Sequence, residues 1–193
     1  VWLGAQGHSF FSTNLFAQNS PEFPPKYYFS FEKGDFKEVL DKEGEKTGVS
    51  KTLPVGWQVV TQGMSKKTLQ WIKVRSPLPS KDPTNKAIRI NLFKRNKQVV
   101  YESDRFNVLP GEAYTVKGFV QTMGNFAGFV KLEIALFDFD GNEVSTVTSD
   151  GVDYSRVWKE FSTPYFIAGK EVSHGRLRIL SLIHISEPTR PNE

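Results

Sequence analysis

The sequence predicts an all-β protein built as a two-sheet antiparallel β-sandwich, and three observations support this fold class. Several segments alternate apolar and polar residues with a period of two, which is typical of strands with one buried and one solvated face. Aromatic residues make up 13% of the 193-residue chain and include 16 Phe, which suit a pleated sheet. No long segment combines helical periodicity with capping residues. We therefore expect about eight to ten short strands.

The first 26 residues are expected to form an irregular leader. They contain NSPEFPPK, with prolines at 21, 24 and 25, and proline removes a ladder donor and restricts the residue before it. The start, VWLGAQGHSFF, has two interpretations. It is either the end of a signal peptide, with Ala5-Gln6-Gly7 as a small-x-small cleavage site, or the frayed leader of a cropped reading frame.

The predicted sandwich spans residues 27–179. Alternation is clearest in KAIRINLF, EAYTVKGFV, FVKLEIALF and RLRIL. Pro110-Gly111 suits the centre of a type II turn, and Asp140-Gly141 between apolar runs is a hairpin signal. Two charged stretches, residues 41–51 and 77–86, are expected to be surface loops. The alternation predicts a core that contains Ile88, Ile90, Leu92, Val116, Val120, Leu132, Ile134 and Leu136.

Four stretches, taken in order, resemble the galactose-binding-like jelly-roll carbohydrate-binding modules that are attached to bacterial glycoside hydrolases. They are FEKGDF, LPVGWQV, ESDRFNVLPGEAYTVKGFVQ, and LFDFDGNEV followed by RVWKEFSTPYFIA. The resemblance covers residues 27–179 and implies a jelly roll. The family's opening element usually ends in a Glu that can ligate a structural calcium. Here Lys37 stands at that position, with Glu38 one place later, and a cation cannot ligate Ca²⁺; whether the complete domain has a calcium site stays open. Nothing after Ile179 resembles the family's last strand, so we expect that strand to be missing.

The end of the chain, LSLIHISEPTR at residues 180–190, resembles a translated sequencing adapter at all eleven positions. We therefore interpret residues 180–193 as a tail that is not native, on a domain truncated at its C-terminus. Leu180, Leu182 and Ile183 are expected to extend a strand, while residues 186–193 trail free. A missing last strand should leave an unpaired sheet edge or an uncovered apolar strip near residues 169–179.

Several kinds of chemistry find no support in the sequence. The chain has no cysteine, which excludes disulfides and thiolate sites. The net charge of +4 is dispersed and no phosphate-binding loop is present, so we expect no nucleic-acid partner. No apolar run is long enough to span a bilayer. His8 and His174 have no metal-ligand spacing, and a carboxylate pair such as Glu102 and Glu133 lacks any sign of a raised pKa. We expect no catalytic residue, no metal and no cofactor.

Sugar binding requires less, namely a flat aromatic ring and a few polar groups. In LQWIKVRS we expect Ile72 and Val74 to face the core, which places Trp71 on the solvated face. The alternative is that Trp71 covers loop residues at the sandwich rim. Trp57 and Trp158 are assigned to the core. The predicted ligand-binding residues are Trp71, Arg75, Arg89, Asn91 and Tyr101.

We therefore expect a non-catalytic polysaccharide-binding module from an exported bacterial protein, secreted or at the cell surface, with a covalently linked catalytic domain as its partner. Two alternatives remain. One is a structural or adhesion sandwich without a sugar site. The other is an accessory domain of a glycoside hydrolase whose catalytic part lies outside this chain.

Overall fold

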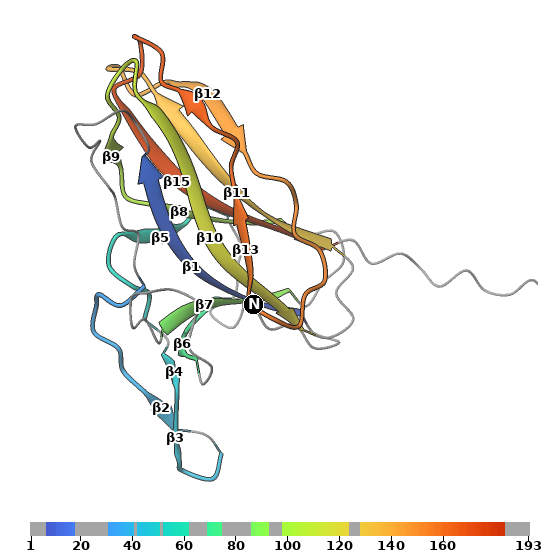
Figure 1. The fold of residues 1–193 in the computed structure, drawn as a ribbon. Helices are drawn as coiled ribbons and strands as arrows, with labels where there is room; N and C mark the ends of the chain where they lie inside the picture. Colours follow the sequence, from blue (N-terminus) through green and yellow to red (C-terminus); the bar gives the residue numbers. More distant parts are fainter. Residues whose placement is uncertain are drawn as a thin grey trace, which may run out of the picture.

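The computed structural model describes residues 7–17, 31–40, 42–50, 52–61, 69–74, 86–92, 98–123 and 128–183. These residues form strands and contain no helix, and every strand pairing among them is antiparallel. Two large sheets face each other across a shared apolar core (Figure 1). The prediction of an all-β antiparallel sandwich is therefore confirmed.

The first sheet has seven strands. They are β1 (Gly7–Ala17), β4 (Val49–Ser50), β6 (Leu69–Lys73), β7 (Lys86–Leu92), β10 (Ala113–Met123), β13 (Lys159–Ser162) and β14 (Phe166–Ile167). Their order is β13-β10-β1-β7-β6-β4, and β14 also pairs with β10.

The second sheet has six strands. They are β5 (Trp57–Val59), β8 (Gln98–Ser103), β9 (Phe106–Asn107), β11 (Gly128–Phe137), β12 (Glu143–Thr148) and β15 (His174–Ile183). Their order is β12-β11-β15-β8-β5, with β9 also paired to β15. A separate hairpin of β2 (Val39–Leu40) and β3 (Lys46–Thr47) extends beyond the sandwich (Figure 1).

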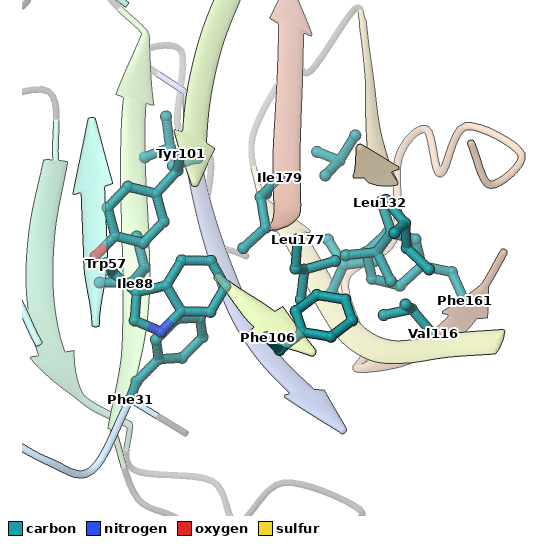
Figure 2. Packing of buried hydrophobic residues seen from close by; sticks show 14 of the residues in the cluster. Phe31, Trp57, Ile88, Tyr101, Phe106, Val116, Leu132, Phe161, Leu177 and Ile179 are labelled. Carbon is teal, nitrogen blue, oxygen red and sulfur yellow. The ribbon is translucent and has the colours of Figure 1, made fainter. Parts of the chain in front are cut away.

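The core between the sheets follows the predicted alternation. Seven of the eight predicted core residues are at most 3% exposed, and the side chain of the eighth, Leu92, lies outside the described residues. Trp57 is buried, and its ring packs against Phe31 and stacks on Tyr101 at 5.0 Å in each case (Figure 2). Trp158 is half-buried against the same core. Both tryptophans therefore serve the structural role expected of them.

Two glycines have the positive φ that the turn predictions require. Gly111 has a φ of 81° and Gly141 one of 85°, where other residues are disfavoured. The amide of Glu112 donates to the carbonyl of Leu109, which closes the turn around Pro110-Gly111. Gly141 lies in the loop that joins β11 to β12, and its amide donates to the carbonyl of Asp138.

The irregular leader predicted over residues 1–26 is wrong for residues 7–17, which form β1. This strand lies inside the seven-stranded sheet, paired with β10 on one side and β7 on the other. The physical reason is that the prolines at 21–25 follow the strand, and no residue of GHSFFSTNLFA lacks a backbone donor. The signal-peptide interpretation stays a prediction.

The predicted C-terminal boundary at 179 stays a prediction, because the same prediction includes a strand extension beyond it. Strand β15 runs to Ile183, so the strand extension expected for Leu180, Leu182 and Ile183 is present. The expected unpaired edge near residues 169–179 is wrong, because β15 pairs with β11 on one side and with β8 and β9 on the other. Residues 184–193 lie outside the described residues, and the adapter interpretation stays a prediction.

Candidate ligand-binding site

Trp71 does not lie on a solvated face. It is 0% exposed and contacts Phe36 edge-on at 5.0 Å. Its cross-strand partner is Ile88, a core residue, so both side chains point into the sandwich. The face assignment was wrong because Ile72, on the opposite face of β6, is also buried. A strand that is buried on both faces carries no alternation signal.

The other predicted site residues do not gather around Trp71. Tyr101 is fully buried on the inner face of the six-stranded sheet, and burial raises the pKa of its hydroxyl. Arg89 and Asn91 share the outer face of the seven-stranded sheet, where Arg89 Nε and Asn91 Nδ2 donate to Gln70 Oε1 at 2.7 and 3.1 Å. Arg75 lies outside the described residues. The five residues therefore do not form the predicted groove.

The outer face of the six-stranded sheet carries a dense ion-pair cluster centred on Arg178. Its Nε lies 2.8 Å from Glu102, its Nη1 3.1 Å from Glu133 and its Nη2 2.7 Å from Glu143. Arg176 adds a contact of 2.9 Å to Glu102. We call these five residues the Arg178 cluster.

The Arg178 cluster leaves Glu102 unsuited to act as a general acid. Burial alone would raise the pKa of Glu102, but hydrogen bonds from Arg178 and Gln58 and the charges of Arg178 and Arg176 outweigh burial and lower this pKa. A glycosidase needs one carboxyl group with a raised pKa. Glu102 therefore has the electrostatics of a residue that stabilises the sheet.

A pocket of about 630 Å³ lies at the rim of the same sheet. We call it the rim pocket. Strand register explains its floor, because Asn107 on β9, His174 on β15 and Phe137 on β11 are consecutive cross-strand partners and so share one face. Phe106 and Gly175, their neighbours in sequence, face the core instead. The pocket is lined by Arg105, Asn107, Phe137, Phe139, Asp140, Gly141, Ser173, His174 and Arg176.

Two aromatic surfaces lie in the rim pocket. The rings of Phe137 and His174 stack at 5.1 Å and 9°. Phe139, in the loop between β11 and β12, is 82% exposed. An exposed large aromatic side chain beside polar groups in a concavity is a typical ligand contact.

Hydrogen bonds fix the orientation of His174. Ser173 Oγ lies 2.6 Å from the carbonyl oxygen of Asp138 and 2.8 Å from His174 Nδ1. The serine hydroxyl donates to the carbonyl, so the arrangement assigns the proton of a neutral imidazole to Nδ1. Nε2 is then the ring acceptor that remains for a ligand.

The charges near His174 are mainly positive. Burial lowers the pKa of His174, the charges of Arg105 and Arg176 lower it further, and Asp138 acts in the opposite direction. The Asp138 carboxylate accepts hydrogen bonds from the amides of Asp140 and Asn142 and from Asn142 Nδ2, at 2.8 to 3.1 Å. These bonds within the loop lower the pKa of Asp138. The described residues contain no group of three or more His, Asp or Glu arranged to hold a metal ion.

Sequence reasoning considered His174 only as a metal ligand and missed the rim pocket. Its residues come from three strands and three connecting segments, and their meeting depends on register between segments far apart in the chain. One local signal was present, because DFDGN places an aromatic residue at the tip of a predicted hairpin, where burial is not expected.

Comparison with known proteins gives a likeness of fold. No protein-family model and no curated protein matches the chain. No described helix is long and apolar enough to cross a membrane. One similar solved structure is the enzymatically active domain of tailspike protein 4 from bacteriophage CBA120, with a TM-score of 0.52 and 8% sequence identity. The match covers 66% of this chain and 17% of the tailspike chain. At this identity the chain shares a β-rich fold with a part of that protein.

Proposed function

We propose that this protein is a non-catalytic carbohydrate-binding module that holds a polysaccharide in the rim pocket. One observation carries the proposal, namely the exposed ring of Phe139 beside a polar pocket. An aromatic ring stacks on the apolar face of a pyranose, while polar side chains bond its hydroxyl groups. Asn107, Asp140 and His174 Nε2 supply both donors and acceptors for this purpose.

The described carboxylates support a binding role over a catalytic one. Glu102 and Glu133, which share the outer face with the rim pocket, are both engaged by Arg178. Neither is offered to a substrate as a free acid. In this proposal the module belongs to an exported bacterial protein. It binds a polysaccharide and so holds a covalently linked catalytic domain close to that substrate. The resemblance of residues 27–179 to modules of bacterial glycoside hydrolases supports this part.

A structural or adhesion domain without a sugar site is the second candidate. The observation that favours it is the burial of Trp71, which removes the aromatic residue on which a sugar site was first predicted. The two candidates differ in what they require of the rim pocket. A structural domain has no need of an exposed Phe139.

Affinity electrophoresis through gels that contain a panel of plant, algal and bacterial polysaccharides tests the proposal. At least one polysaccharide should retard the protein, and Phe139→Ala should weaken retention about fivefold, because a lost aromatic contact is worth roughly 1 kcal/mol. The matched control is Tyr165→Ala, which removes another exposed aromatic ring, one outside the pocket. Retention that survives Phe139→Ala, or no retention on any gel, would favour the structural candidate.

A further inference from the structure

The described arginines of the six-stranded sheet differ in how many of their donors are used. Arg178 bonds three carboxylates. Among the described residues, Arg176 bonds Glu102 through Nη1 alone. Arg105 makes no ion pair or hydrogen bond within the described part of the chain. A guanidinium has five N–H donors, so the two arginines that line the rim pocket keep most of their donors available.

The two carboxylates near the rim pocket differ in how many hydrogen bonds they accept from described residues. Three hydrogen bonds within the loop engage the carboxylate of Asp138. Asp140 is exposed and its carboxylate has no such bond among the described residues, so it is an acceptor for ligand hydroxyl groups. Arg105 and Arg176, in contrast, both act on His174 through their charges. The pocket thus has a cationic side formed from β15 and the residue before β9, and an acceptor side formed by the loop between β11 and β12.

We infer that the rim pocket selects an acidic glycan, whose anionic group binds Arg105 and Arg176 while its hydroxyl groups face Asp140. This inference rests on the proposed function and names its substrate class. Guanidinium groups pair with planar carboxylates through parallel N–H···O bonds, and they bind sulfate groups by the same donors. A neutral sugar would leave the charge of Arg105 without a partner.

The experiment compares retention of the full chain on polygalacturonate, on the same polymer fully methyl-esterified, on a sulfated galactan and on a neutral galactan. Esterification removes the charge and keeps the sugar ring. We expect retention on polygalacturonate or on the sulfated galactan, and at least tenfold weaker binding to the uncharged polymers. Arg105→Gln should reduce binding to the acidic polymer about tenfold, the loss of one charge-assisted contact.

A protein of net charge +4 attracts any polyanion to some degree. The control is therefore Arg156→Gln, which removes the same charge from an exposed arginine outside the pocket. It should leave binding unchanged. Equal losses for Arg105→Gln and Arg156→Gln would show diffuse attraction and overturn the inference.

The remaining outcomes separate the inference from the proposed function. Equal binding to esterified and free polygalacturonate, abolished by Phe139→Ala, would overturn acidic selectivity and leave carbohydrate binding in place. Retention on no polymer would overturn both. Binding of inorganic sulfate without retention on any polymer would identify a site for free anions and would also overturn both.

Discussion

The outer face of the six-stranded sheet carries charged residues both at its centre and at its rim. Those at the centre are paired, whereas the rim keeps hydrogen-bond donors that no described residue uses. At the centre, Arg178 has three carboxylate partners and Glu102 is almost fully buried. At the rim, Arg105 has no partner within the described part of the chain, and Phe139 is largely exposed. The difference teaches that charge by itself does not mark a site. A saturated cluster stabilises the sheet, and unused donors in a concavity are available to a ligand.

Burial explains why the centre must be saturated. A buried carboxylate that loses its cation pays a desolvation cost with nothing to offset it. An exposed arginine stays hydrated, so the absence of a partner costs little free energy. Arg105 in the rim pocket can therefore stay without a carboxylate partner among the described residues at little cost in stability.

The largest expected effect is on stability, from Glu102→Ala. This change leaves Arg176 without its carboxylate and removes one partner of Arg178, and we expect it to lower the free energy of unfolding by about 3 kcal/mol. Denaturant melts measure this directly. Glu160→Ala is the control, because Glu160 forms an exposed pair with Lys117 at 3.5 Å that should be worth at most about 1 kcal/mol. Equal losses in the two variants would contradict the claim that the buried pairing of Glu102 stabilises the protein more than an exposed ion pair does.

A second prediction concerns an unused polar group that lies in the core. Ser181 is 0% exposed, and its Oγ has no hydrogen-bond partner among the residues that the structure describes. Ser181→Val should raise the free energy of unfolding by about 1–2 kcal/mol, because an unpaired buried hydroxyl is costly. Ser103→Val should do the opposite, since Ser103 Oγ accepts from the amide of Leu177 at 2.9 Å and donates to Asp104 at 2.8 Å. A loss of stability in Ser181→Val would contradict this account.

The environment of Ser181 also distinguishes the two halves of β15. Up to Ile179, apolar residues face the core and arginines face outward. From Leu180 the pattern inverts, with Ser181 inside and Leu180 and Leu182 outside. Pairing with β8 and β11 continues without a register shift through this inversion. The neighbouring strands therefore set the register, and the apolar–polar pattern of residues 180–182 does not match it.

The pH dependence of stability should differ between centre and rim. Because the folded-state pKa of Glu102 is lowered below its ordinary value of 4.5, its contribution is present above that pH and is lost as the pH falls through the folded value. Melting temperatures should therefore drop on acidification below 4.5. Glu102→Gln should show a smaller drop, and an unchanged profile in that variant would contradict the assignment.

The smallest predicted effect is the pH dependence of ligand binding. His174 faces Arg105 beside β9, Asp138 after β11, Asp140 in the loop and Arg176 on its own strand. An anionic group beside these arginines should raise the lowered pKa of His174. Protonation then favours the bound state, so affinity for an acidic glycan should rise modestly as the pH falls below about 6.5, the ordinary imidazole value. His174→Gln should weaken binding at neutral pH, because it removes the Nε2 acceptor, and the affinity that remains should not rise as the pH falls.

Alternation predicted the core correctly because apolar and polar residues alternate along an antiparallel strand that has one buried and one solvated face. It failed at Trp71, whose strand is buried on both faces, and at β1, where nearby prolines suggested a leader. The rim pocket could not be predicted, because Asn107, His174 and Phe137 meet only through the register of three strands. Register between distant segments is a property of the assembled sheet.

The most direct test of the central claim is NMR titration of the protein with an oligogalacturonide, following backbone amides and the His174 ring. The account predicts shifts at residues 105–107, 137–141 and 173–176, the segments that line the rim pocket. It also predicts much smaller changes at Gln70, Arg89 and Asn91 on the outer face of the other sheet. Shifts confined to that other face, or no shifts with any acidic or neutral oligosaccharide, would contradict it.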